Sequence, residues 1–194
     1  MTRRFPDNLV YGFHGTSDAH VPGILRDGFQ RSTKPWDWLG HAAYFWEGDF
    51  ERAAEWAPTR VEEIGGSPVV LRATIDLAHC CDLTIQKYRS QLAKVAAIVM
   101  SVMPEDLATE LHQTEKRREL DCYVLNSLFS GAVYADGTPV FTTVRGLFRE
   151  GEPLYAADRS DGTTLESGIY SQDHIQIGVL HQSAILDIDV MYLD

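Results

Sequence analysis

The chain has 194 residues, 44% of them hydrophobic, and its 28 acidic and 17 basic side chains give a formal net charge of −11. This length and apolar content suit one globular domain over residues 1–194, with a sizeable core. The acidic balance disfavours broad binding to a phosphate backbone, and because no apolar window approaches the length of a bilayer span we expect no membrane association.

The first residues and the cysteines bear on the cellular compartment. Residues 1–6 contain two arginines without a following apolar run, so we expect no secretory leader. The cysteines, Cys80, Cys81 and Cys122, are odd in number and include no Cys-x-x-Cys pair. They favour a reducing cytoplasm, with a secreted effector that acts in a target cytoplasm as the alternative. They offer no zinc site, and no His-x-x-x-His pair suggests another metal.

Hydrophobic periodicity and turn residues divide the chain into alternating elements. The pattern predicts strands near residues 11–17, 39–46, 69–75, 141–148, 171–179 and 184–193. It predicts helices over 21–29 and, after a cap at Asp49, over 50–57, and a mostly helical section over 83–130 that breaks at Pro104 and continues as a further helix over about 104–129. Residues 158–168, rich in Asp, Gly, Ser and Thr, are expected to form a mobile surface loop.

The first motif is Tyr11-Gly12-Phe13-His14-Gly15-Thr16-Ser17. A histidine and a glycine after a strand let an imidazole and a bare stretch of backbone face a ligand together, because glycine has no side chain to hold a ring at a distance. A motif this short also arises by chance. Its structural interpretation is a strand end followed by a helix cap at Ser17 or Asp18.

The second motif lies in residues 38–47, where Gly40 precedes Tyr44 and Phe45 in an aromatic strand. His-Gly-Thr on a first strand, a short helix that ends at Gly28, and Gly-x-x-x-Tyr-Phe on a second strand together resemble the ADP-ribosyltransferase superfamily, in its diphtheria-toxin and poly(ADP-ribose) polymerase branch. The resemblance is clearest over residues 11–57 and returns near the C-terminus. It implies a site that takes NAD as substrate and uses a histidine, tyrosine, glutamate triad.

The resemblance gives roles to the first motif. His14 would hydrogen-bond the adenosine ribose of NAD. Gly15 would hold the nicotinamide carboxamide through its main-chain N–H and C=O. Thr16 or Ser17 would assist at a ribose.

It also places the remaining site residues. Tyr44 would stack on the nicotinamide ring, with Phe45 beside it at the cofactor. Gln176 occupies the third triad position at the start of a strand, where this sequence departs from glutamate, and would hydrogen-bond the nicotinamide ribose. His174 is the rival for that position, since strand alternation puts it on the same face. Because glutamine cannot accept a proton, an acceptor would bring its own nucleophilicity or use a base such as His174 or Glu166.

The fold implied is a single mixed α+β domain. A small, split, mostly antiparallel sheet would cradle NAD in its central cleft, and helices from the middle of the chain would pack outside. No Gly-x-Gly-x-x-Gly follows a strand, which argues against a Rossmann fold.

We therefore expect an NAD-dependent mono-ADP-ribosyltransferase without a metal, acting on a macromolecular acceptor, either protein or nucleic acid. Residues 116–118, Lys-Arg-Arg, are a basic patch for phosphates or a solvated helix face. By resemblance, small members of this kind are often bacterial toxins or defence factors, with an antitoxin or immunity protein as partner. The alternatives are an NAD hydrolase and a non-catalytic module that binds NAD or ADP-ribose. The missing glutamate favours the module, whereas His14 and Tyr44 favour the enzyme.

Overall fold

The structure is a computed structural model and describes residues 8–114 and 117–193. The N-terminal arginines and Lys116 lie outside the described residues. The strands are β1 (Leu9–Ser17), β2 (Ala43–Glu47), β3 (Pro68–Asp76), β4 (Cys80–Asp82), β5 (Thr143–Phe148), β6 (Ala156–Asp158), β7 (Thr164–Glu166), β8 (His174–Val179) and β9 (Ile185–Tyr192). The helices are α1 (Val21–Asp27), α2 (Phe50–Ile64), α3 (Gln86–Val102), α4 (Glu105–Glu110) and α5 (Glu119–Gly131), with short 3-10 turns η1 (Asp18–His20) and η2 (Gln182–Ala184).

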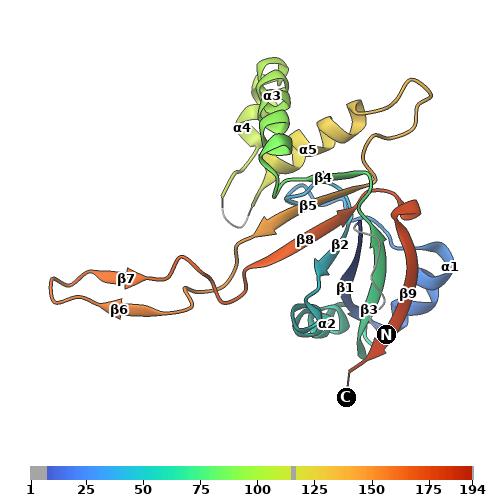
Figure 1. Cartoon of the computed structure of the whole chain (residues 1–194), viewed down its shortest axis with the longest axis horizontal. Coiled ribbons are helices and arrows are strands. Elements are labelled where there is room, and N and C mark those ends of the chain that lie inside the picture. The colour runs from blue at the N-terminus through green and yellow to red at the C-terminus, as the bar shows by residue number, and fades with distance from the viewer. Residues whose placement is uncertain (1–7, 115–116, 194) are drawn as a thin grey trace.

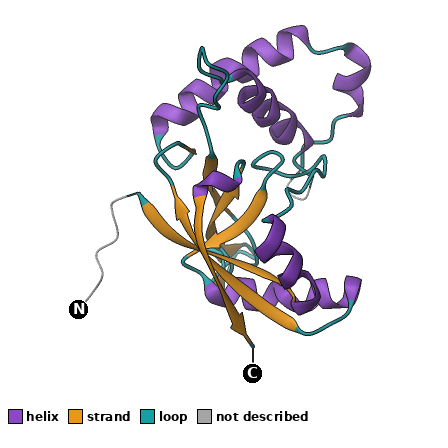
Figure 2. Cartoon of the chain, turned by 90° about the vertical axis from the view of Figure 1, so that its right-hand side faces the viewer, coloured by secondary structure: helices purple, strands orange, loops and turns teal. Residues whose placement is uncertain are grey.

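The fold is mixed α+β and rests on a seven-stranded sheet in the order β4-β5-β8-β2-β1-β3-β9 (Figure 1). Every pairing in it is antiparallel except that of β4 with β5, so the expectation of a mostly antiparallel sheet is confirmed. The remaining strands, β6 and β7, form a separate two-stranded hairpin that extends away from the sheet. Helices α3, α4 and α5 gather at the β4 and β5 end of the sheet, as Figure 2 also shows.

The sheet is unevenly paired at its centre. β1 and β3 pair along their whole length, from Leu9↔Asp76 to Ser17↔Pro68. β1 and β2 share only two residue pairs, Gly12↔Glu47 and Phe13↔Trp46. The two strands therefore part just before the His-Gly-Thr motif.

Alternation along the strands divides the core between the two sheet faces. One face carries Phe45, Leu71, Ile75 and Ile177, all fully buried, and is covered by α1 and Phe29. The other face carries a smaller cluster under α2, built from four buried residues, Phe13, Trp46, Ala53 and Val70. A third cluster, which includes Leu39 and Val144, packs near α5.

Several local predictions from the sequence are confirmed. Ser17 caps η1, since its hydroxyl oxygen accepts a hydrogen bond from the N–H of Ala19 at 3.2 Å. Gly28 ends α1 with φ of 83°, a conformation that glycine adopts freely. Asp49 caps α2 by accepting the N–H of Arg52 at 3.0 Å. That helix runs past the predicted end at 57 to Ile64, with Pro58 inside it.

Other predictions are wrong in detail. The strand predicted at 39–46 begins only at Ala43, because Gly40 has φ of 81° and the preceding residues form turns. The helix predicted over 104–129 is two helices, α4 and α5. The mobile loop predicted at 158–168 includes the end of β6 and all of β7, which pair as Ala156↔Glu166 to Asp158↔Thr164. Across the described ranges, no helix combines the length and apolar character that a bilayer crossing requires.

Candidate functional site

The site predicted from the sequence lies where β1 and β2 part. In an antiparallel pair the main-chain groups of successive residues point to opposite sides of the strand. The N–H of Gly48 donates to the carbonyl oxygen of Tyr11 at 2.9 Å, which shows that odd-numbered residues of β1 face β2. Continuing that register would place Gly15 opposite Tyr44, but the pairing has ended after Phe13↔Trp46. The main-chain N–H and C=O of Gly15 therefore face the gap between the strands.

His14 lies across this gap. Its Nδ1–H donates to the carbonyl oxygen of Tyr44 at 2.8 Å, the oxygen that a continued ladder would offer to Gly15. On the inner face its ring contacts Phe29 and Phe45, with ring centroids 5.1 and 5.6 Å away. Burial lowers the pKa of His14 below its usual value, so the ring is neutral at neutral pH and keeps Nε2 as an acceptor.

Gly15 is required to be glycine by the helix behind it. A β-carbon built there would stand 2.1 Å from the carbonyl oxygen of Ala53 and 2.9 Å from the main-chain nitrogen of Ala57, both on α2. The two alanines are fully buried against the strand. The bare backbone that the sequence suggested as a ligand contact thus also lets α2 approach β1.

Thr16 and Ser17 are buried and their hydroxyls already have partners. The Thr16 hydroxyl lies 3.3 Å from Nδ1 of His20, and the Ser17 hydroxyl donates to the carbonyl oxygen of Gly65 at 2.6 Å. Phe45, also predicted at the cofactor, is fully buried beneath His14. These three residues therefore support the gap from within the fold.

Tyr44 is held firmly by its own loop. Its hydroxyl donates to the carbonyl oxygen of Gly40 at 2.8 Å and accepts the N–H of Leu39 at 3.1 Å. Burial raises its pKa far above the ordinary value, so the phenol stays protonated. Strand register places Tyr44 on the same sheet face as Gly15, which leaves its ring, and not its hydroxyl, as the group for a ligand.

Gln176 lies on that same face, directly opposite Trp46 in the β2 and β8 pairing. Its Oε1 accepts the indole N–H of Trp38 at 2.6 Å. Because indole is only a donor, this bond fixes the orientation of the amide, and the NH₂ group of Gln176 is the part left to donate. The loop before β2 thus occupies the one acceptor atom of the predicted third triad residue.

His174 shares the face of Gln176, as alternation predicted, but it is deeper. Its side chain is 1% exposed, and its Nδ1–H donates to the carbonyl oxygen of Gln172 at 2.7 Å. Its ring lies against Phe148 and Trp46, with centroids 5.4 and 6.1 Å away. Among the described residues, Nε2 of His174 and Nε1 of Trp46 find no hydrogen-bond partner. These two buried polar atoms beside Gln176 are the groups that a bound water or a ligand would satisfy.

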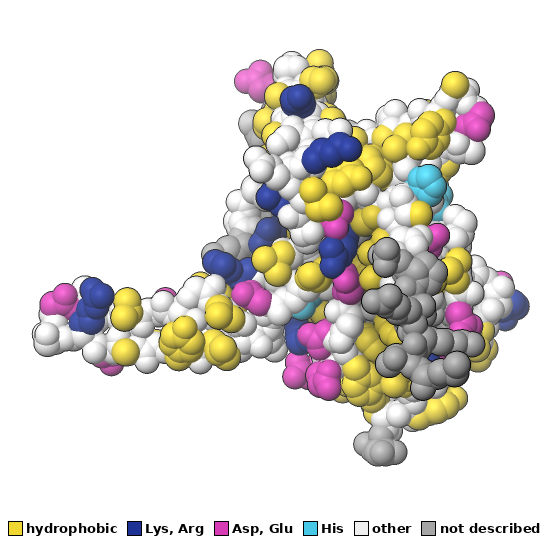
Figure 3. All heavy atoms as spheres, in the orientation of Figure 1, with side chains coloured by type: hydrophobic (Ala, Val, Ile, Leu, Met, Phe, Trp, Pro, Cys, Tyr) yellow, Lys and Arg dark blue, Asp and Glu magenta, His cyan; other side chains and the backbone are white. Residues whose placement is uncertain are grey.

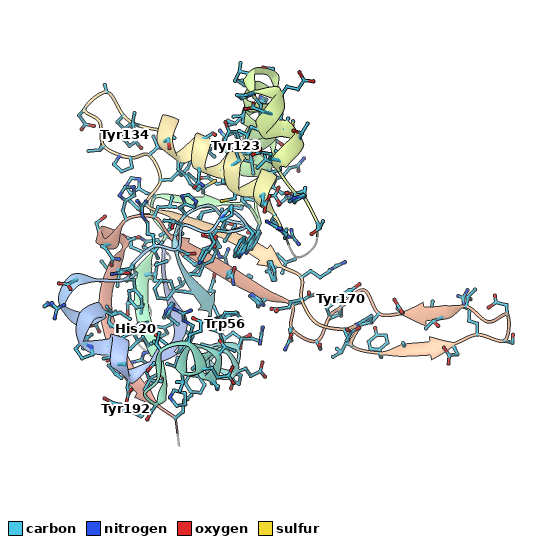
Figure 4. All side chains as sticks on the ribbon, turned by 180° about the vertical axis from the view of Figure 1, so that it is seen from behind. His20, Trp56, Tyr123, Tyr134, Tyr170 and Tyr192 are labelled. Carbon is cyan, nitrogen blue, oxygen red and sulfur yellow. The ribbon has the colours of Figure 1, made fainter. Side chains whose placement is uncertain are left out.

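Two residues of this face were missed in the sequence. Trp56 on α2 (Figure 4) is 45% exposed. Its ring lies 6.0 Å from that of Trp46, so the two rings form an aromatic surface beside β2. Arg52, one turn earlier, stands over the Trp46 ring and bonds Glu150 at 2.8 Å. The sequence contains a signal for both residues. The small side chains of Ala53 and Ala57 indicate which side of α2 packs against the sheet, and Arg52 and Trp56 come directly before these two alanines.

The structure does not unite all predicted residues on one surface. Gly15, Tyr44, Gln176 and His174 share one face, whereas His14 projects to the other and reaches the gap only through its ring edge. Within residues 8–114 and 117–193, no three histidine, cysteine, aspartate or glutamate side chains converge as metal ligands would.

The three cysteines are unpaired in the described structure, and Cys81 packs in the hydrophobic cluster that Tyr44 also contacts. Burial raises the pKa of Cys80 and Cys122 to about 11 and that of Cys81 to about 12, so all three remain thiols at neutral pH. A protonated, buried thiol is a poor nucleophile and a poor metal ligand.

Glu166, the other base considered from the sequence, is also remote. It lies on β7 of the protruding hairpin and is exposed.

No protein-family model matches this sequence, and no curated protein matches it significantly.

Proposed function

We propose that this protein is an NAD-dependent mono-ADP-ribosyltransferase whose nicotinamide site is the gap between β1 and β2. The observation that carries the proposal is the main chain of Gly15, which presents an N–H and a C=O to the gap opposite Tyr44. A primary carboxamide offers one N–H and one C=O in the complementary order, as a neighbouring strand would. The nicotinamide group of NAD carries such a carboxamide next to a flat ring.

The aromatic side chains around the gap support the same ligand. The rings of Tyr44 and Trp46 lie on the face of Gly15, and Trp56 extends that surface toward solvent. Stacking on such rings adds about 0.5–1.5 kcal/mol beyond the area that is buried. His14, neutral and held by Tyr44, offers Nε2 to a ribose hydroxyl on the other side of the gap.

Cleavage of the bond between nicotinamide and ribose needs little acid–base help. The leaving nicotinamide departs neutral, and positive charge develops on the ribose as in glycoside hydrolysis. Orientation is then the main requirement, and the NH₂ group of Gln176 serves it by donating to a ribose hydroxyl. A macromolecular acceptor would supply the nucleophile.

One observation favours a second candidate, a module that binds NAD or ADP-ribose without catalysis. The bond from Trp38 uses one lone pair of Oε1 of Gln176, and a neutral amide oxygen stabilises the ribose cation less than a carboxylate does. A glutamate in the same position would keep the Trp38 bond with one oxygen and present the other. The two candidates therefore differ in what a single substitution should do.

The test measures nicotinamide release from NAD, with and without cell lysate as a source of acceptors. For the transferase we expect lysate-dependent release by the wild type, and a fall of roughly 10²–10³-fold for Gln176→Ala, the scale for losing one oriented polar contact. For Gln176→Glu we expect faster NAD hydrolysis, since a carboxylate stabilises the cation and gives water a base. His174→Ala tests whether His174, and not Gln176, serves as the third catalytic residue.

The outcomes separate the candidates. Binding of NAD, seen as thermal protection, without release by the wild type would support the non-catalytic module. Release independent of lysate would indicate an NAD hydrolase. No thermal protection by millimolar NAD would refute both candidates. Mass spectrometry of lysate after incubation with labelled NAD then identifies the acceptor class.

A further inference from the structure

The hairpin between β5 and β8 forms an arm, defined here as residues 152–171. It leaves the sheet beyond Phe148 and returns at His174, and it projects into solvent (Figure 1). Its strands β6 and β7 are exposed throughout. An isolated two-stranded hairpin is at best marginally stable in water and gains stability when it packs against another surface.

Along β6 and β7, one face of the arm is apolar. The pairing Ala157↔Leu165 continues to Tyr155, whose carbonyl oxygen accepts the N–H of Ser167. Because side chains alternate along a strand, Tyr155, Ala157 and Leu165 point to the same side of the hairpin. Tyr155 is 67% and Leu165 is 55% exposed. The opposite side carries Asp158 and Glu166. Figure 3 shows the hydrophobic side chains gathered along the arm.

A second uncovered apolar surface lies on helix α3. None of its 17 residues is buried, and Met100 is 51% exposed. A helix with apolar residues on several sides normally lies inside a protein or an assembly. Between α3, α5 and the sheet lies an apolar groove of about 850 Å³. Its lining includes Leu92, Ala96, Met100, Val124, Leu147 and Ile175.

Charge matches these two surfaces. The only charged residues of α3 are the bases Lys87, Arg89 and Lys94, in a chain whose net charge is −11. The arm carries four carboxylates and one arginine: Glu152, Asp158, Asp161, Glu166 and Arg159. An acidic hairpin with an apolar face therefore complements an apolar groove beside a basic helix.

We infer that the arm of one copy docks in the α3 groove of a second copy, and that the second copy's arm docks in return. The groove adjoins the root of the arm, because Leu147 and Ile175 line it and immediately flank the strand ends from which the arm departs. Two copies related by a twofold axis near these roots can exchange arms reciprocally, as isologous dimers do. Each exchange covers both uncovered apolar surfaces, and it is independent of NAD.

The test uses the full chain in sedimentation-velocity and native mass-spectrometry measurements. The arm variant is Tyr155→Ser with Leu165→Ser, and the groove variant is Met100→Asp, which puts a carboxylate into the groove where the apolar face of the arm would dock. We expect a wild-type dimer whose dissociation constant rises roughly tenfold or more in either variant. All these side chains are exposed, so circular dichroism and the melting temperature should stay near those of the wild type.

Matched controls isolate the surfaces. Ile98→Asp places the same charge on α3 outside the groove lining, and Leu186→Ser removes an exposed leucine from β9. Both should leave the dimer intact. Mixing the arm variant with the groove variant should give a heterodimer, since one intact arm then meets one intact groove.

Three results would overturn the inference. A wild type that is monomeric at high protein concentration excludes the exchange. A dimer that tolerates both the arm and the groove variants places its interface elsewhere. Variants that remain monomeric when mixed, under conditions where the wild type is dimeric, exclude reciprocal docking.

Discussion

Gly15 lies so close to α2 that a β-carbon on it would stand 2.1 Å from the carbonyl oxygen of Ala53. Main-chain atoms cannot rotate away as a flexible side chain can, so Gly15→Ala must push the helix off the strand. We expect the free energy of unfolding to fall by about 3 kcal/mol, the upper end for overpacking. Urea unfolding measures it.

The control for this change is Gly23→Ala on α1, where a β-carbon meets nothing within 4 Å. Alanine in a helix is favoured over glycine by about 0.5–1 kcal/mol, so this variant should be as stable as the wild type or more stable. Equal stability of Gly15→Ala and the wild type would contradict the close approach of α2.

Tyr44→Phe separates the two roles of this side chain. It keeps the ring and removes the hydroxyl that satisfies Leu39 and Gly40. We expect a loss of about 1–2 kcal/mol in stability, since the buried N–H of Leu39 loses its partner. Thermal protection by NAD should survive in this variant and disappear in Tyr44→Ala. Tyr192→Phe, at a 73% exposed tyrosine, is the control and should change neither quantity.

His14 gives stability a defined dependence on pH. Burial holds its folded-state pKa below the ordinary 6.5, so between these two values the unfolded chain binds more protons. Stability should therefore fall as the pH is lowered through this window, by at most about 1.4 kcal/mol per pH unit. Unfolding free energies between about pH 5 and 8 should show a shallower slope for His14→Gln than for the wild type.

His181→Gln is the comparison for that experiment, because partial desolvation also lowers the pKa of His181 although this residue is exposed. Its removal should change the slope less than removal of His14. A wild-type slope that is unchanged in His14→Gln would mean that this imidazole is not kept neutral by the fold.

Arg145 joins three strands through two carboxylates. It bonds Glu47 of β2 at 2.5 and 2.8 Å and Asp82 of β4 at 2.9 Å. Hydrogen bonds to Glu47 raise the pKa of Arg145 above its usual value. In Arg145→Met the two carboxylates would face each other without a cation. We expect a loss of about 2 kcal/mol, less than for a fully buried pair because these side chains are 16–21% exposed.

Arg26→Met controls for the loss of an arginine in general. The Arg26 and Asp27 side chains are 72% and 63% exposed, and such pairs contribute between 0 and about 1 kcal/mol. Chemical denaturation of both variants at neutral pH makes the comparison. A loss in Arg145→Met no larger than in Arg26→Met would show that the three strands do not depend on this guanidinium.

Much of the fold was predictable from local chemistry. The apolar run of β3, the cap at Asp49 and the end of α1 at Gly28 each follow from residues within a few positions. The shared face of His174 and Gln176 follows from strand alternation alone. The early end of the β1 and β2 pairing was not predictable, because it depends on the His14 ring reaching the carbonyl of Tyr44, thirty residues away.

Other features also depend on distant residues. The sequence gives no sign that Trp38 would bond Gln176, 138 positions later, and so decide which end of the amide is available. The strand β4 is short, and in the described structure it joins the sheet through its pairing with β5. The sequence predicts a loop where the hairpin of β6 and β7 lies, because its Asp, Gly, Ser and Thr residues are typical of turns and only three residues on each side pair.

The order of the strands in the sheet determines when the chain can complete it. β1, one neighbour of β2 in the sheet, is already synthesised when β2 emerges, but the other neighbour, β8, follows about 130 residues later. β3 is likewise synthesised long before its neighbour β9. During synthesis both β2 and β3 therefore present unpaired edges while α3, α4, α5 and the arm are produced. Such long-range pairings slow folding and leave edges open to wrong partners. This topology favours a chain that folds only after synthesis has passed β9.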